Sequence, residues 1–376
     1  MVNGQLVGDG VTKERIRALH SIQRKAKLLA SSRILSKWPE FQKYFASGCD
    51  ITSELISPRL ELIDGRTWQS DLFALATLNW SVPTSNGYGR RLRFLCWDDS
   101  NNKLIGLIAL ADPVFNLKVR DDFVGWTGAD RIKRLSCVMD AYVLGAVPPY
   151  NLLLSGKMLA CLLKSSDIFD AFKEKYSSYK SVISQRRLKP TLALITTSSS
   201  LGRSSVYNRL KLQDEFFLRP VGETRGYGHF HIPERLFLQM RAFLTKRRHQ
   251  YASGHKFGQG ANWRMRVIRE TLKQLGLSQN LLKHGIAREV FVSELAPNTL
   301  AFLRGDSKTL DVSRLKSVSE IGKLAIDRWV IPRAERRQDF ATWTLENTLE
   351  GFTNLAASTK QLSTRPPEES QNLRQR

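Results

Sequence analysis

Two apolar runs separated by a short polar turn constrain the fold of this chain more than any other segment. The runs RRLRFLCW (residues 90–97) and KLIGLIALADP (residues 103–113) flank the string DDSNN. Both runs have the length and composition of strands, and Asp, Ser and Asn favour tight turns. This segment predicts an antiparallel β-hairpin, around which the other elements must be arranged.

Further strands and helices alternate on both sides of the hairpin. Strand-like patterns cover residues 57–63, 134–145 and 192–195, and residues 215–233 are typical of a two-stranded ribbon closed by Pro233. Helical patterns cover residues 12–38, 40–46, 68–80, 151–163 and 167–176. We therefore expect an α+β fold with a mixed central sheet flanked by helices.

The pattern divides the chain into four parts. We expect an N-terminal helical extension (1–56), a sheet domain (57–233), a basic and mainly helical C-terminal region (234–353), and a tail (354–376). The tail is polar and contains proline, a composition typical of disorder.

A polar segment follows the predicted strand near residue 195. The string TTSSSLG (196–202) fits neither periodicity, and a second helical pattern begins at Ser204. A strand, a loop and a helix N-terminus in succession direct free N–H groups at one spot, where an anion or a substrate carbonyl can bind. The alternative is a well-capped turn without a ligand.

Charge is the distinctive feature of the composition. The 376 residues include 58 Lys and Arg against 35 Asp and Glu, a net charge of +23. Nucleic acid, most simply DNA, is the expected partner of such a chain, and no apolar run is long enough to span a bilayer. The first twenty residues lack the apolar core of a secretion signal, so we expect a cytoplasmic protein.

The positive charge is concentrated between residues 241 and 289, which contain eleven Lys and Arg against two Glu. Aromatic residues and glycines lie among these cations, a mixture that suits single-stranded or distorted nucleic acid. A solvated charged face is the alternative. The predicted nucleic-acid-binding residues are Arg247, Arg248, Lys256, Trp263, Arg264 and Arg266.

Other polar groups are candidates for chemistry. Arg120 and Asp121, followed by Asp122, could line a cleft or form a local salt bridge, and Asp140 lies on the predicted strand 134–145. His229 and His231 have no third partner at a recognisable spacing, and the four cysteines form no CxxC pair, so no metal site is predicted. Phosphate-binding loops of the GxxxxGK[ST] type are absent.

The order of strands and helices over residues 57–233 resembles the GNAT superfamily of N-acetyltransferases. The resemblance implies that acyl-CoA lies in a gap between the fourth and fifth strands, with its pyrophosphate at the N-terminus of the helix that follows the fourth strand. The residues at that position are Leu154, Ser155, Gly156 and Lys157.

The same resemblance makes Tyr207 the catalytic acid, and Asp140 is a second catalytic candidate on the cleft wall. Arg203, Ser204 and Asn208 would face whatever occupies the gap. In the alternative interpretation, the ring of Tyr207 packs in the core and Asn208 caps a neighbouring loop.

Several longer strings carry a closer resemblance. The segments RLRFLCWDDSNNKLIGLIALADPVF, RDDFVGW, LGAVPPYNLLLSGKMLACL and LGRSSVYNRL resemble the DruA family of the Druantia anti-phage systems. This resemblance implies a role in antiviral defence together with other defence proteins. It attaches no particular reaction to the chain.

Overall fold

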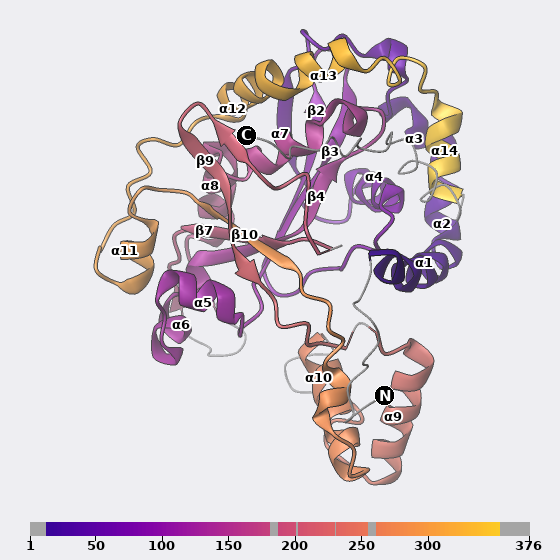
Figure 1. Cartoon of the computed structure of the whole chain (residues 1–376), viewed down its shortest axis with the longest axis vertical. Coiled ribbons are helices and arrows are strands. Elements are labelled where there is room, and N and C mark those ends of the chain that lie inside the picture. Colours follow the sequence, from indigo (N-terminus) through magenta and orange to yellow (C-terminus); the bar gives the residue numbers. More distant parts are fainter. Residues whose placement is uncertain (1–12, 181–186, 201, 230, 255–260, 354–376) are drawn as a thin grey trace, which may run out of the picture.

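The predicted hairpin lies within the main sheet (Figure 1). In the computed structural model, β2 (Arg91–Asp98) and β3 (Lys103–Ala111) pair antiparallel, and β1 (Pro58–Leu62) adds to the free edge of β2. The structure describes residues 13–180, 187–200, 202–229, 231–254 and 261–353. The hairpin prediction is confirmed.

Eight strands form the main sheet in the order β1-β2-β3-β4-β7-β10-β9-β8. The strands beyond the hairpin are β4 (Val138–Ala146), β7 (Leu194–Ser198), β8 (Leu210–Leu212), β9 (Glu215–Glu223) and β10 (Glu289–Glu294). Only the β4–β7 pair is parallel; every other pair in this sheet is antiparallel. A separate two-stranded sheet joins β5 (Tyr179–Lys180) and β6 (Arg187–Leu188).

The parallel contact between β4 and β7 is short. Residues Val138 to Asp140 pair with Leu194 to Thr196, whereas β4 continues to Ala146. On its other edge β4 carries an irregularity, since Val143 and Ala141 oppose the successive residues Ala109 and Leu110. The two strands therefore part beyond Asp140, and the space between them must be filled by another segment.

One face of the sheet is covered by α7 (Ser155–Leu162), α8 (Ser166–Tyr176), α12 (Val318–Ala325) and α13 (Ile331–Arg336). Their apolar side chains pack with Met139, Ile195 and Phe291 of the sheet. Serine side chains define two of these helix starts: Ser165 accepts from the Ile168 N–H, and Ser317 forms a capping box with Glu320.

Two groups of helices share the other face. Over β2, β3 and β4 lie α1 (Lys13–Leu29), α2 (Ser32–Leu35), α3 (Trp38–Phe41), α4 (Trp68–Ala76) and α14 (Leu345–Thr353). Over β4, β7 and β10 lie α5 (Lys118–Val124) and α11 (Thr299–Arg304), with α6 (Gly128–Arg134) beside them. The prediction of a mixed sheet flanked by helices is confirmed.

An arm projects from the sheet between β9 and β10, and we define it as residues 234–283 (Figure 1). It contains α9 (Glu234–Lys246) and α10 (Ala261–Gln274), which pack through their own cluster of Phe237, Leu244, Trp263, Val267 and Ile268. This cluster is separate from the clusters that cover the sheet. The arm is thus a small helical unit with its own core.

Two local predictions are wrong, and one helix was not predicted. Residues 205–209 form turns instead of a helix. Ser204 Oγ accepts from the Tyr207 N–H as at a helix start, but Asn208 Nδ2 bonds the Ser204 carbonyl and Arg209 adopts a left-handed φ of 59°, so no helix continues. Residues 118–124, which lie in none of the predicted helices or strands, form α5. The ribbon 215–233 is only β9, whose partners are β8 and β10, because the buried Val290, Phe291 and Val292 provide an apolar partner strand.

Some expectations lie outside what the structure describes. Residues 354–376, expected to be disordered, are among them. Within the described ranges, no helix combines the length and the apolar character needed to cross a membrane.

Candidate functional site

The turn after β7 carries the predicted catalytic Tyr207. Its Oη donates to the carbonyl of Leu144 at 2.9 Å, and its ring lies edge-on to Phe291 with centroids 5.6 Å apart. Burial raises the pKa of Tyr207 well above its ordinary value, so the side chain is a neutral phenol. Since Leu144 lies beyond the β4 residues that pair with β7, Tyr207 fills part of the space between the strands.

Lys157, a predicted cofactor ligand, holds the same turn. Its Nζ donates to the carbonyls of Ser205, Val206 and Asn208 at 3.2, 3.3 and 3.2 Å. A Cβ added at Gly156 would lie 3.4 Å from Val206 Cγ1. The N-terminus of α7 is therefore in contact with this turn of the same chain.

The other residues predicted to bind the cofactor shape the entry to α7. Leu154 adopts a left-handed conformation with φ of 60°, and Ser155 is fully buried. In the turn, Asn208 Nδ2 donates to the Ser204 carbonyl at 2.5 Å, and Arg203 is exposed to solvent. These contacts are those of a capped turn that is tied to α7.

Asp140 lies at the point where β4 and β7 part. Thr196 Oγ1 donates to its carboxylate at 2.6 Å, and burial raises the pKa of Asp140 to about 6, against the opposing effects of Thr196 and the Arg120 charge. By strand alternation Asp140 shares a face with Val138, which packs under α5 and α11. Tyr207 packs against the opposite face, so the structure does not bring the two predicted catalytic residues together.

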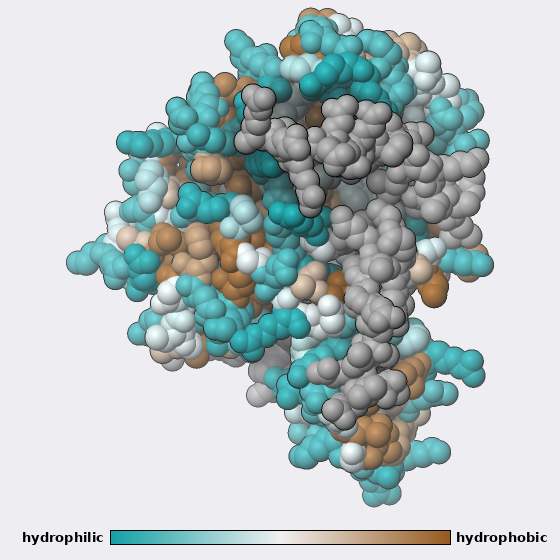
Figure 2. All heavy atoms as spheres, in the orientation of Figure 1, coloured by the Kyte–Doolittle hydropathy of each residue, from teal (hydrophilic) through white to brown (hydrophobic). Residues whose placement is uncertain are grey.

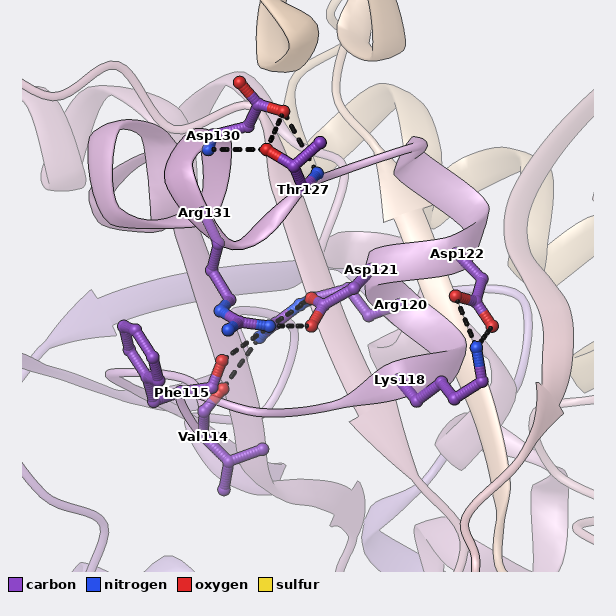
Figure 3. A network of polar contacts seen from close by, with 9 residues as sticks. All are labelled: Val114, Phe115, Lys118, Arg120, Asp121, Asp122, Thr127, Asp130 and Arg131. Atoms are coloured by element: carbon purple, nitrogen blue, oxygen red, sulfur yellow. Dashed lines mark hydrogen bonds and ion pairs between the residues drawn. The ribbon is translucent and has the colours of Figure 1, made fainter.

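Arg120 and Asp121 form a buried network, shown in Figure 3. The fully buried Arg120 guanidinium donates to Asp121 Oδ1 at 2.6 and 2.9 Å and to the carbonyls of Val114 and Phe115 at 2.9 and 3.0 Å. Asp121 Oδ2 accepts from Arg131 at 2.6 Å. Both carboxylate oxygens accept hydrogen bonds, so the Arg120–Asp121 pair holds α5 and α6 together. Its geometry is that of a local salt bridge and not of a pair that lines a cleft.

The predicted nucleic-acid-binding residues divide into two groups. Arg247, Arg248 and Arg266 are exposed on the arm. Trp263 is only 6% exposed, and its Nε1 donates to the Tyr251 carbonyl at 2.7 Å, so its ring is not available for stacking on bases. Arg264 bonds Glu234 and the Ile232 carbonyl, and Lys256 lies outside the described residues.

A recess on the arm brings together cations and an aromatic ring that the sequence analysis did not combine into one site. It has a volume of about 360 Å³ and is lined by Tyr251, Arg266, Arg269, Glu270, Lys273 and Gln279. The spacing of its three cations, i, i+3 and i+7, is the periodicity of one helix face and is visible in the sequence. The position of Tyr251 opposite them depends on tertiary packing, which the sequence pattern does not contain.

Metal ligands do not converge in the part of the chain that the structure describes. No group of three or more His, Cys, Asp or Glu there is placed to hold a metal ion. His231 lies beside His284 with ring centroids 5.6 Å apart, and its Nε2 bonds the Leu281 carbonyl. These contacts attach the base of the arm to the segment that precedes β10.

The fold and the arm define an α+β protein with a mixed sheet and a basic helical insertion, and sequence comparison places it in the DruA family. The family described as "Druantia protein DruA" matches residues 10–305. The Druantia protein DruA of Escherichia coli (strain UMEA 4076-1) is 48% identical over 353 residues, covering 94% of this chain and 87% of that protein. No solved structure is significantly similar to the chain.

We predict that Asp121→Ala lowers the free energy of unfolding by about 3 kcal/mol, because it leaves the buried Arg120 charge without its carboxylate. The neighbouring Asp122 is exposed and pairs with Lys118 in the same helix, so Asp122→Ala should cost less than about 0.5 kcal/mol. Urea unfolding of both variants measures the difference. Equal losses would contradict a structural role for the Arg120 network.

Proposed function

We propose that this protein is a component of a Druantia anti-phage defence system and that it engages nucleic acid through the arm. Membership in the DruA family supports the defence role, and with it a dependence on other proteins of the system. The charge of the arm supports the nucleic-acid role. The second part rests on one observation, the exposed cations of α9, α10 and their flanking segments.

The arm carries eleven Lys and Arg against two Glu. Each Glu side chain has a partner within the arm. Glu234 pairs with Arg264, and the Glu270 carboxylate lies 3.6 Å from His249 Nε2. The exposed cations are Arg235, Lys246, Arg247, Arg248, Arg266, Arg269, Lys273 and Lys283.

The position of the arm allows a polyanion to approach it. It extends away from the sheet in Figure 1, and Figure 2 shows hydrophilic residues over much of it, next to a hydrophobic patch near its end. When the cations of a projecting surface neutralise phosphates, the nucleic acid releases the counterions condensed on its backbone. This release gives strong binding at low salt. The Phe243 ring holds the Arg247 side chain in place, since the guanidinium lies 3.8 Å from the ring centroid.

We expect charge reversal at the cluster after α9 to weaken binding. The triple variant Lys246→Glu, Arg247→Glu, Arg248→Glu should lose at least about tenfold in affinity for a fluorescent DNA oligonucleotide at 50 mM salt. Its plot of log affinity against log salt should be shallower by about 2 to 3, since three phosphate contacts are lost.

A matched control changes the net charge equally but leaves the arm intact. Lys173, Lys308 and Lys323 are exposed on the body of the protein, and their reversal to Glu should change affinity by less than about threefold. If both triple variants lose the same affinity, net charge rather than the arm determines binding. If the unaltered protein shows no binding at low salt, the nucleic-acid part of the proposal is wrong.

We further propose that the sheet is a GNAT-like scaffold that has lost its acyl-CoA site. The strand order and the short parallel β4–β7 contact support the likeness to the superfamily. The contacts of Lys157 and Tyr207 argue against a bound cofactor, because the turn 203–208 occupies both the start of α7 and the space beside Leu144. The competing function is acyl-CoA-dependent acetylation of a protein or small amine, with Asp140 as its base.

Calorimetric titration with acetyl-CoA separates the two possibilities. The scaffold proposal predicts no binding heat at millimolar ligand, because the ligand would have to displace the turn and break its hydrogen bonds to Lys157 and Leu144. Saturable heat at one ligand per chain would support the transferase. An Asp140→Asn variant serves as a control there, since it should bind the cofactor but fail to transfer an acetyl group.

A further inference from the structure

The recess of the arm has a size and a set of lining side chains that suit one nucleotide. Its volume of about 360 Å³ lies at the small end of the range of ligand pockets. Arg266, Arg269 and Lys273 line one side of it from a single face of α10, and Tyr251 contributes an aromatic ring from a separate segment. A phosphate and a base therefore find different partners within one recess.

Hydrogen bonds hold the recess in this shape. Arg269 Nε donates to Gln279 Oε1 at 3.3 Å, and Gln279 Nε2 donates to the Arg269 carbonyl at 2.9 Å, so the segment after α10 is attached to the helix. The Tyr251 ring lies 4.9 Å from the His249 ring and 5.9 Å from the Arg266 guanidinium. The Arg266 guanidinium lies over this ring, so a base that stacks on Tyr251 replaces it there and the guanidinium turns to the phosphate.

The arrangement distinguishes a single strand from a duplex. Tyr251 can stack only on a base whose face is exposed, whereas the bases of a duplex are stacked on each other. The cations can contact the phosphates of either form. Glu270 adds one negative charge to the recess, which disfavours a ligand that consists of phosphate groups alone.

We propose that this recess binds one unpaired nucleotide of a single strand, with the base on the Tyr251 ring and the phosphate among Arg266, Arg269 and Lys273. The inference rests on the proposed engagement of nucleic acid by the arm. It adds that the arm prefers a single strand to a duplex. The exposed Lys246, Arg247 and Arg248 lie outside the recess and supply attraction that is common to both forms. Single-strand preference is thus assigned to Tyr251 and not to the total charge.

Two substitutions of Tyr251 test the stacking contact. Tyr251→Leu keeps an apolar side chain but removes the ring, and it should weaken binding of a fluorescent 12-nucleotide single strand about tenfold, the effect of losing one base stack. Tyr251→Phe keeps the ring and should change affinity less than twofold. Binding of a hairpin duplex of the same sequence should change less than twofold in both variants, as measured by fluorescence anisotropy.

A second pair of variants tests the phosphate contact without altering Tyr251. Lys273→Gln, inside the recess, should weaken single-strand binding about fivefold, and Lys308→Gln, an exposed lysine on the body of the protein, less than twofold. Circular dichroism melting establishes that each variant is folded. The Lys273 comparison decides the outcome if Tyr251→Leu unfolds the arm.

The outcomes separate this inference from the proposed function. If the unaltered protein binds neither oligonucleotide at low salt, both are wrong. If it binds them but Tyr251→Leu and Lys273→Gln leave single-strand affinity unchanged, or Tyr251→Leu weakens duplex binding equally, the recess is not a nucleotide site, while engagement through the arm stands. Loss of single-strand binding in both recess variants, with duplex binding retained in Tyr251→Leu, supports the inference.

Discussion

The short parallel contact between β4 and β7 is the constraint on which the rest of the structure depends. The strands pair only as far as Asp140 and Thr196 and then part, although β4 continues to Ala146. Buried backbone carbonyls need partners, and the Tyr207 hydroxyl supplies one to Leu144 beyond the paired region. The turn 203–208 thereby joins the two halves of the sheet.

This arrangement has a consequence for function. The turn that fills the separation is itself held by Lys157 from the start of α7, so strand, turn and helix form one continuous set of contacts. A ligand between the strands would have to replace all of them. The sheet is therefore better suited to carry other parts of the protein than to bind a cofactor in this position.

The arm is inserted in the sequence between β9 and β10 and has its own apolar cluster. Trp263 and Arg264 illustrate how this core uses residue types that also bind nucleic acid: Trp263 packs edge-on against Phe237, and Arg264 lies 4.2 Å from the same ring. The exposed cations are thus displayed on a folded support, which fixes their spacing relative to a bound strand.

Local pattern was sufficient for part of this structure. The hairpin and the apolar helix 68–76 follow from composition and turn residues, since both are determined within short segments. The position of β10 between β7 and β9 could not be predicted, because the partner strands are separated from it by the whole arm.

The candidate sites show the same division. The sequence located the basic region but could not distinguish the buried Trp263 from the half-buried Tyr251, since both lie among cations and differ only in how α9 and α10 pack. Likewise, alternation along β4 placed Asp140 on a cleft wall, but the opposite face assigned to Tyr207 follows from the path of the turn.

Hydrogen exchange with and without a single-stranded oligonucleotide tests the central claim most directly. The account predicts slower amide exchange at residues 246–254 and 263–279 on binding, and unchanged exchange at residues 138–146 and 203–212. Protection of the turn 203–212 and of β4, with no change in the arm, would show that the ligand binds at the sheet and would contradict the account.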